Sequence, residues 1–479
     1  MKLDYDVVVV GYGGAGAAAA IEAHDKGAQV LLIEKQEKPG GTTTLSTGLM
    51  MIPKDAKKAK TYVERLTGSV TDKKSISVFI KEAGKNVKWL ESLGATVEKL
   101  GRETIRGYPN VGRSSPGFQV EGAEEIEIYT VKGGYLAGEN LFGILKSAVE
   151  KRKIKTLLNT RALKLITEKG EIRGLVASTR GKQITIMARR GIILACGGFE
   201  YNDEMKRNFL PIPLEAFGTP GNTGDGIKMS MEVGAKLWHM NAISPAFSYK
   251  IPNVGMVSHF MPTARFIYVN QDGRRFCDES SLEGHTSWMS VSNYDIKKLR
   301  YPGIPSFVIF DDLGRRAGRI GHFRSGFAKE SGKTWSEDNS KEVGRGWIKK
   351  GDTPHELASK LGISPDALDE TITKYNEACT TGTDSEYHRT ALESLDTPPF
   401  FGIAIYPALG NTQGGPKRNS KCQVQNLEEK PIAGLYSAGS LGSIWGFLYQ
   451  GGGNISECLT SGRIAGREAA KARLARDVK

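Results

Sequence analysis

The 479-residue sequence lacks the compact ligand patterns that hold structural metals or iron–sulfur clusters in proteins. Its five cysteines are odd in number and contain no CxxC pair, which argues against both a disulfide framework and a cysteine-ligated cluster. Its seven histidines form no HxH or HxxxH pair, so we expect no protein metal site. The cysteine pattern is typical of a reduced, intracellular protein.

Long hydrophobic runs are also missing. No stretch approaches the roughly 18 apolar residues of a membrane span. The apolar run Val7–Val10 has only the length of a strand, and the N-terminus lacks the basic start, long apolar core and cleavage site of a signal peptide. We therefore expect a cytoplasmic protein with no membrane span, and the length suits two or three domains.

Acidic residues are fewer than basic ones, and the formal net charge is +13. A nucleic-acid binder would gather this excess on one element with aromatic residues between the charges, whereas here it is spread along the chain. The small groups are Lys57, Lys58 and Lys60, and Lys471, Arg473, Arg476 and Lys479. We interpret them as solvated helix faces and expect no nucleic-acid partner. The alternative is a weak attraction for an acidic electron-carrier protein.

The first forty residues contain a strand–helix–strand pattern. Asp6–Val10 predicts a buried parallel strand, Gly11–Gly16 a tight turn, Ala15–Lys26 a helix and Gln29–Glu34 a second strand. A unit of about 30 residues with this order begins a doubly wound α/β sheet.

The glycine turn at 11–16 predicts a dinucleotide site. Gly11 allows the tight turn, Gly13 lets the backbone approach a pyrophosphate, and Gly16 lets the helix pack closely on the sheet. The pyrophosphate then lies at the helix N-terminus, where free N–H groups favour an anion. Glu34 follows Gly11 by 23 positions, at the end of the next strand, where its carboxylate can bind ribose hydroxyls.

The next segment favours FAD over NAD as the dinucleotide. Residues 39–46 read Pro-Gly-Gly-Thr-Thr-Thr-Leu-Ser and follow the ribose-binding acid directly. A long FAD requires a second loop here that faces its phosphates and its flavin, and a nicotinamide enzyme does not.

The remaining pattern predicts a Rossmann-like FAD-binding domain made from both chain ends, with an α+β capping domain inserted between them. We expect the FAD-binding domain at 1–232 and 359–479, and the capping, substrate-binding domain at 233–358. The expected elements are a helical region at 54–93, a hairpin or loop at 101–135, strands at 153–169, 171–179, 182–195, 266–270 and 435–439, and a helix at 364–379.

Eight motifs follow one another along nearly the whole chain. They are GYGGAG at 11–16, GGTTTLSTG at 40–48, LACGGF at 194–199, NTGDGI at 222–227, GRRF with Glu279 at 273–279, NTQGG at 411–415, GLYSAGS at 434–440 and GGGN at 451–454. With these motifs in this order, the sequence resembles the flavoprotein family of fumarate reductases, succinate dehydrogenases and 3-ketosteroid dehydrogenases. It is more similar to the ketosteroid dehydrogenase-like branch than to true fumarate reductases.

The resemblance implies a set of FAD contacts. They are Gly11, Gly13, Gly14, Ala15, Gly16, Glu34, Lys35, Gly41, Thr42, Thr43, Ser46, Ala162, Gly197, Asp225, Gly439, Ser440, Asn454 and Ile455. Gly439 and Ser440 stand where the family often has Glu. Residues 42–46 contain no histidine for covalent attachment, so we expect non-covalent FAD. No haem motif is present, so electrons must come from or go to an external redox protein or nicotinamide.

Three positions depart from the fumarate reductases that the chain resembles. Glu283 stands where those enzymes have a proton-donating arginine, Gln450 replaces a carboxylate-binding arginine, and Asn411 replaces a substrate-binding histidine. A dicarboxylate needs such cations. We therefore expect a flat, largely uncharged substrate, such as a steroid enone or an isoflavonoid-like plant phenolic, whose C=C bond is reduced or formed.

The candidate residues for this chemistry surround those positions. Tyr449, then Glu283 and His285, are the candidates for proton transfer. Asn411, Thr412, Trp445 and Gln450 are the candidates for substrate binding. An apolar pocket could come from Phe247, Tyr249, Phe260, Trp288 and Phe327.

Several alternatives stay open. Tyr449 and Trp445 could simply pack at a domain interface, Glu283 could be a surface carboxylate and His285 a hydrogen-bonded loop residue. Arg265 or Arg113 could anchor a dicarboxylate instead. The remaining alternative is a binding protein that keeps an inactive flavoprotein fold.

Overall fold

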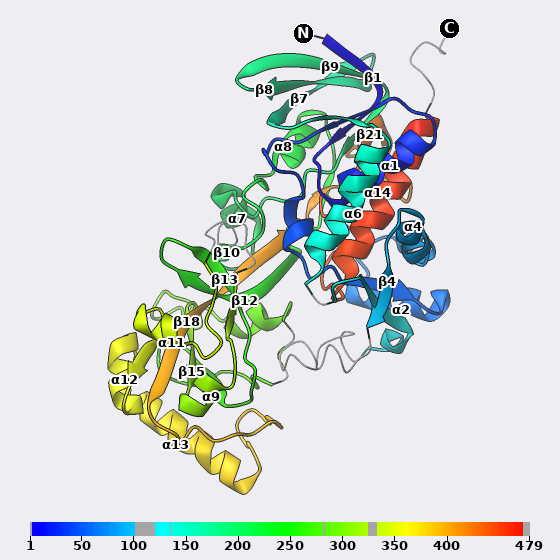
Figure 1. Ribbon diagram of the computed structural model, residues 1–479. Helices are drawn as coiled ribbons and strands as arrows, with labels where there is room; N and C mark the ends of the chain where they lie inside the picture. Colours follow the sequence, from blue (N-terminus) through cyan, green and yellow to red (C-terminus); the bar gives the residue numbers. More distant parts are fainter. Residues whose placement is uncertain are drawn as a thin grey trace.

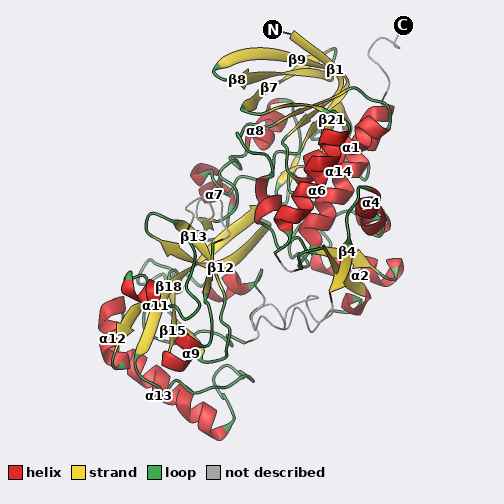
Figure 2. Cartoon of the chain, in the orientation of Figure 1, coloured by secondary structure: helices red, strands yellow, loops and turns green. Residues whose placement is uncertain are grey.

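The computed structural model describes residues 2–100, 120–134, 136–280, 282, 284–323 and 333–472. Within them the chain forms two eight-stranded sheets, one toward each end of an elongated molecule (Figure 1). Helices lie beside both sheets, as the red and yellow colouring of Figure 2 shows. The fold is therefore a mixed α/β fold.

The first sheet contains the predicted glycine-turn strand at its centre. Its path is β20-β21-β9-β1-β2-β6, and β7 and β8 extend it beside β9. The strands are β1 Lys2–Val10, β2 Val30–Ile33, β6 Lys155–Leu157, β7 Thr160–Glu168, β8 Glu171–Thr179, β9 Lys182–Leu194, β20 Gln423–Gln425 and β21 Pro431–Ser437. The strands β21, β9, β1, β2 and β6 run parallel. Val7, Val8 and Val9 are fully buried, as parallel strands covered on both faces require.

Helices from both ends of the chain lie side by side on this sheet (Figure 1). They are α1 Gly14–Asp25, α14 Gly453–Lys471 and, beside them, α6 Gly138–Lys151. Small residues allow the close approach, because a Cβ on Gly462 would lie 2.4 Å from the Ala15 carbonyl oxygen and one on Gly466 2.3 Å from that of Ala19. The α1 helix thus packs against a segment more than 425 residues away in the sequence.

The second sheet has the path β14-β15-β18-β12-β13-β16, with β10 and β17 also paired to β18. Its strands are β10 Glu215–Ala216, β12 Ile243–Ile251, β13 Gly255–His259, β14 Phe266–Val269, β15 Ser306–Phe310, β16 Gly321–His322, β17 Lys349–Gly351 and β18 Phe400–Thr412. The helices near it are η3 Ser287–Val291, α9 Asp312–Arg316, α11 Ser340–Gly344, α12 Pro354–Leu361 and α13 Pro365–Thr381.

Helix α13 begins where the sequence predicts it. The Ser364 side chain accepts a hydrogen bond from Ala367 N, and Pro365 occupies the first helical position. Leu368 and Ile372 of this helix pack against the second sheet, and β18 pairs within that same sheet. We therefore propose that the inserted unit extends to about residue 412 rather than to the predicted boundary at 358.

A small three-stranded sheet flanks the first one. It contains β3 Met50–Pro53, β5 Ile126–Val131 and β4 Val97–Leu100 in that order. The predicted helical region becomes α2 Ala56–Leu66, α3 Lys73–Ala83 and α4 Asn86–Ser92. Residues 101–119 of the predicted hairpin or loop lie outside the described residues. The remaining elements are η1 Gly41–Leu45, η2 Ala123–Glu125, α7 Asp203–Phe209, α8 Asp225–Glu232, β11 Leu237–Trp238 and β19 Gly415–Pro416.

The five cysteines carry no disulfide bond. Among the helices that the structure describes, none combines the length and the apolar composition needed to cross a bilayer.

Candidate functional site

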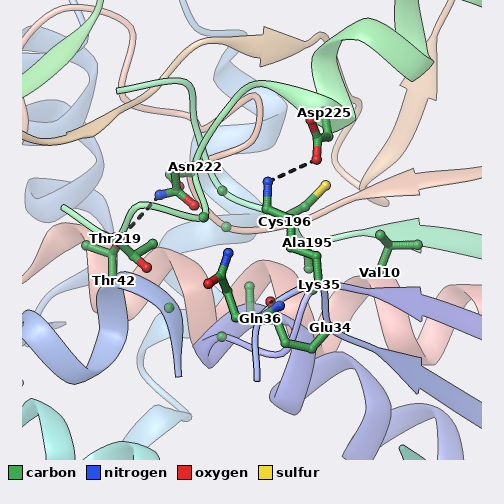
Figure 3. A pocket seen from close by; sticks show the side chains of 18 of the residues that line it. Val10, Glu34, Lys35, Gln36, Thr42, Ala195, Cys196, Thr219, Asn222 and Asp225 are labelled. Atoms are coloured by element: carbon green, nitrogen blue, oxygen red, sulfur yellow. Dashed lines mark hydrogen bonds and ion pairs between the residues drawn. The ribbon is translucent and has the colours of Figure 1, made fainter. Parts of the chain in front are cut away.

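A first cavity of about 110 Å³ opens where the parallel strands of the first sheet end. Ligands of doubly wound sheets bind at this edge. Figure 3 shows side chains from several segments pointing into it. The predicted cofactor residues that line it are Gly11, Gly13, Gly14, Ala15, Glu34, Lys35, Gly41, Thr42, Thr43, Ala162, Gly197, Asp225, Gly439 and Ser440.

The glycine turn has the geometry that a pyrophosphate needs. Gly11 has φ +103°, and a Cβ on Gly16 would lie 1.8 Å from the Gly11 carbonyl oxygen, so both positions require glycine. A Cβ on Gly13 would meet only the Gly40 carbonyl oxygen, at 3.7 Å, because the rest of that space is cavity. No side chain caps α1, although Gly14 N donates to Thr43 Oγ1 at 3.0 Å. The first turn of α1 therefore offers N–H groups to an anion.

Glu34 stabilises the glycine turn, and its side chain also lines the first cavity. Its carboxylate accepts hydrogen bonds from the backbone N–H groups of Tyr12 and Gln36, both at 2.8 Å. A carboxylate has about four acceptor positions, so two remain for ribose hydroxyls. The predicted ribose contact is therefore compatible with this second, structural role.

Asp225 forms ion pairs with two cations at the cavity wall. Lys35 Nζ lies 2.9 Å from its carboxylate, and Arg161 Nη2 lies 2.8 Å away. Figure 3 marks the Lys35–Asp225 ion pair with a dashed line. Burial alone would raise the pKa of Asp225, but the hydrogen bonds and charges of Arg161 and Lys35 hold it below its usual value. The two ion pairs thus connect the start of α8 to Lys35, which follows β2, and to Arg161 of β7.

Glu200 is a neighbour of this site that the sequence reasoning missed. It is fully buried, and Asn222 Nδ2 donates both to Glu200 Oε1 at 2.6 Å and to Thr42 Oγ1 at 3.2 Å (Figure 3 draws the Asn222–Thr42 bond). Burial raises the pKa of Glu200 to about 7. A carboxylate directly after the LACGGF motif was the available signal.

A second cavity of about 300 Å³ lies between the first cavity and the second sheet. The two cavities share Thr42, Thr43, Ser440 and Cys458, so they are contiguous. The predicted residues that line the second cavity are Ser46, Phe247, Phe260, His285, Asn411, Tyr449, Asn454 and Ile455. Asn454 and Ile455 begin the 19-residue helix α14, whose N-terminus therefore faces this space.

The described residues that line the second cavity are mostly apolar or carry hydroxyl groups. Among the described residues that line it there is no lysine, arginine, aspartate or glutamate. The basic side chains present are the imidazoles of His259 and His285. The described wall therefore combines apolar groups with hydroxyl, amide and imidazole groups.

Tyr449 lies against β12 of the second sheet. Ser244 Oγ of β12 donates to Tyr449 Oη at 2.7 Å, and the His285 ring lies 4.3 Å from the Tyr449 ring, centroid to centroid. Asn411 lines the same cavity and accepts from Asn454 Nδ2 at 3.2 Å. The structure thus brings together three of the predicted residues, Tyr449, His285 and Asn411.

Three other predicted substrate residues do not line the cavity. Thr412 Oγ1 accepts from Phe199 N at 3.0 Å, and Gln450 Oε1 accepts from Tyr62 at 2.5 Å. Trp445 is fully buried and packs edge-on against Phe79. These side chains support the wall from behind.

The other predicted positions are dispersed. Trp288 lines a smaller cavity behind His285 and Tyr449, and Tyr249 is buried behind the second cavity. Arg265 is paired with Asp311 and Asp396, away from the cavity. Glu283, Phe327 and Arg113 lie outside the described residues.

Known proteins resemble this chain along most of its length. The family model described as FAD binding domain matches residues 6–455. A fumarate reductase (cytochrome) of Shewanella frigidimarina is 29% identical over 97% of this chain and 77% of its own length. A 3-oxosteroid 1-dehydrogenase of Mycobacterium tuberculosis is 25% identical over 96% of this chain and 97% of its own.

A solved structure is similar in fold. It is a 3-ketosteroid delta1-dehydrogenase from Sterolibacterium denitrificans in complex with 1,4-androstadiene-3,17-dione, with a TM-score of 0.83 and 22% identity. The alignment covers 98% of this chain and 99% of that one.

Proposed function

The chain belongs to the FAD binding domain family and is an FAD-dependent oxidoreductase acting on CH–CH groups, and we propose that its substrate is a flat, largely uncharged molecule such as a steroid enone or an isoflavonoid-like plant phenolic. The reaction is the reduction of a C=C bond or its reverse. The similarity to a 3-oxosteroid 1-dehydrogenase supports a steroid.

The lack of lysine, arginine, aspartate and glutamate among the described residues that line the second cavity carries this proposal. Burying two carboxylates against neutral walls costs far more than neutral hydrogen bonds return. The described lining offers a dicarboxylate no arginine or lysine, and Arg265 is already held by two aspartates. Phe247 and Phe260 instead offer apolar surface to a flat ring system.

The residues of both cavities fit FAD. The glycine turn and Glu34 would hold the adenosine diphosphate, Thr42, Thr43 and Ser440 would line the passage between the cavities, and the N-terminus of α14 would face the flavin. When bound, FAD supplies the centre that exchanges a hydride with the substrate carbon. Residues 42–46 contain no histidine, and we propose that the binding is non-covalent.

Tyr449 is the proposed proton-transfer residue. Ser244 donates to the phenol oxygen of Tyr449, so the Tyr449 proton is directed away from Ser244. From there Tyr449 can protonate or deprotonate the neighbouring substrate carbon, or polarise a carbonyl group. His285 lies against its ring, and Asn411 offers an amide to a substrate oxygen. Glu283 stays a further candidate.

The test is anaerobic photoreduction of the purified holoenzyme, followed by reoxidation with steroid enones, isoflavonoid-like phenolics and fumarate. We expect an enone or a phenolic to restore the oxidised flavin spectrum at least about tenfold faster than fumarate. Reoxidation by fumarate at a comparable rate would overturn the substrate assignment. The screen does not depend on the identity of the external electron donor, which we propose is a redox protein or a nicotinamide.

A fumarate- or succinate-type reaction is the second candidate, favoured by the 29% identity to a fumarate reductase. It requires a cation from elsewhere, such as Arg113. Malonate or succinate that perturbs the flavin spectrum at millimolar concentration supports this candidate, and an unchanged spectrum at high concentration opposes it.

A further inference from the structure

Two serines on neighbouring strands lie opposite each other in the wall of the second cavity. Ser248 of β12 and Ser258 of β13 both line this cavity. They face each other directly in the antiparallel pairing of the two strands, so their side chains point to the same face of the sheet. Only 1% of Ser248 and 7% of Ser258 is exposed. We call these two residues the serine pair.

The hydroxyl groups of the serine pair make no hydrogen bond to any residue that the structure describes, nor to each other. Two other serines of the same cavity differ in this respect, because Ser244 donates to Tyr449 and Ser287 donates to a backbone carbonyl oxygen. A buried hydroxyl that has left water without gaining a partner destabilises a fold, and most buried polar side chains in proteins are therefore bonded. Two such hydroxyls side by side in a cavity wall point to a ligand atom as their partner.

The spacing of the serine pair suits a single acceptor atom. Residues directly opposite each other in an antiparallel sheet have Cβ atoms about 4.5–5.5 Å apart. An oxygen atom between the two hydroxyls can accept a hydrogen bond of about 2.7–2.8 Å from each of them. A carbonyl oxygen has the two lone pairs that this requires. A methylene group at the same place would leave both serine hydroxyls without a partner.

The serine pair lies far from the proposed proton-transfer residue, on the same face of β12. Side chains two and four positions apart in a strand point the same way, so Ser244, Ala246 and Ser248 share one face, and all three line the cavity. The nearby register shift adds a residue to β18 and not to β12, so this alternation is kept. Ser244 contacts Tyr449, and Ser248 follows four positions later, which is roughly 13 Å along the strand.

We propose that the serine pair binds an acceptor oxygen at the end of the substrate remote from Tyr449, with both hydroxyls donating to that one atom. The inference rests on the proposed function, because it concerns the same cavity and substrate class. It narrows that class to flat molecules that carry an oxygen atom at the end opposite the reacting C=C bond. The small side chain of Ala246, between the two ends, leaves the ring system room to lie along β12.

The test measures the binding of two steroid probes to the oxidised holoenzyme through the change in flavin absorbance. One is 1,4-androstadiene-3,17-dione, and the other is its analogue with a methylene group in place of the 17-carbonyl. We expect the wild-type enzyme to bind the dione roughly tenfold more tightly, because two hydrogen bonds distinguish the probes. The double variant Ser248→Ala, Ser258→Ala should bind both equally, through weaker binding of the dione alone. Each single variant should keep a preference of roughly threefold, since one hydroxyl still donates.

The matched control is Ser359→Ala, which removes an exposed serine hydroxyl from α12, outside the cavity lining. It should keep the full preference. A wild-type enzyme that binds both probes equally, or a double variant that keeps the preference, overturns the inference and leaves the proposed function intact. If a phenolic and no steroid reoxidises the flavin, the same comparison uses that phenolic and its analogue without the remote hydroxyl group. If neither class reoxidises the wild-type flavin, the proposed function fails and the role of the serine pair fails with it.

If the double variant loses FAD or has a lowered melting temperature, the two single variants decide. A reduced preference in both supports the inference, and the full wild-type preference in both overturns it. The ratio of the two dissociation constants is the diagnostic readout, since general structural damage weakens the binding of both probes together.

Discussion

Ser244 Oγ donates a 2.7 Å hydrogen bond to Tyr449 Oη and so joins a strand of the second sheet to the loop that precedes α14. Both residues belong to the lining of the second cavity. The hydrogen bond fixes the phenol ring and occupies one lone pair of its oxygen, which leaves the hydroxyl proton pointing elsewhere. A tyrosine held in this way is suited to proton transfer, since its orientation does not depend on the substrate.

Replacing Tyr449 by phenylalanine should therefore slow turnover without loss of the cofactor. We expect kcat to fall by roughly 10²- to 10⁴-fold, the usual contribution of a positioned acid or base. Ser244→Ala should cause a smaller loss. The first cavity, which is proposed to hold the adenosine diphosphate part of FAD, is not lined by Tyr449, so the flavin absorbance per protein should not change. The control is Tyr294→Phe, at a largely exposed tyrosine. A Tyr449→Phe enzyme with more than a tenth of wild-type kcat contradicts the proposed role.

Gly13→Ala should weaken FAD binding in a protein that still folds. The new methyl group meets only the Gly40 carbonyl oxygen at 3.7 Å, but it occupies the surface along which the pyrophosphate is proposed to run. We expect an affinity loss of roughly tenfold or more, measured by titrating apoprotein with FAD. Gly143→Ala is the matched control, because its methyl group has no neighbour within 4 Å and lies on α6. Equal affinities of Gly13→Ala and wild type would place the pyrophosphate elsewhere.

Glu200 should make the stability of the enzyme depend on pH. The unfolded chain loses this proton near pH 4.5, whereas the folded protein keeps it to about pH 7. Between these values the folded state binds more protons, so the free energy of unfolding falls as pH rises and levels off above about 7. Over this pH range the free energy of unfolding falls by on the order of 3 kcal/mol.

The Glu200→Gln variant tests this pH dependence, because glutamine imitates the protonated carboxyl group. Its stability relative to wild type should rise from pH 4.5 to 7.5 in urea unfolding of the FAD-loaded enzyme. Burial raises the pKa of Glu457 as well, but that group is present in both proteins and cancels in the difference. Glu428→Gln, at an exposed side chain, should track wild type. A constant difference between Glu200→Gln and wild type across this range would exclude the assignment.

The thiols at the cavities should resist alkylation. Cys196 and Cys458 line the first cavity, and burial raises the pKa of each to about 12. At pH 8 only about one thiol in 10⁴ is then a thiolate, the reactive form. Iodoacetamide should modify the less buried Cys379 first, as peptide mass spectrometry can determine, while turnover persists. Modification of Cys458 at the rate of Cys379 would contradict this expectation.

The sequence predicted local elements well, for a physical reason. In β1, α1 and β2 the periodicity and the glycine spacing are properties of neighbouring residues, and Glu34 follows from the same unit. Tyr449, Trp445 and Gln450 are close in sequence, yet only Tyr449 reaches the cavity, because loop dihedral angles decide which side chain points inward.

Long-range pairing was the part that could not be predicted. Helix α13 was found from its cap, but its packing on the second sheet depends on β18, whose partners lie far away in the sequence. The contacts of His259 with Tyr249 and Tyr268 are similar, since the three residues come from three different strands. The position of Glu200 beside the first cavity also depends on a long-range contact, the hydrogen bond from Asn222, which lies 22 positions later in the sequence.

The narrow overlap of the two cavities has an evolutionary consequence. Thr42, Thr43, Ser440 and Cys458 belong to both linings, and the rest of each lining comes from its own segments. With substrate and cofactor in the cavities proposed for them, mutations in β12, β13 or β14 can therefore reshape the substrate wall while the cofactor stays in place. A lineage built in this way can exchange one substrate for another through single substitutions and never pass through an ancestor without its flavin.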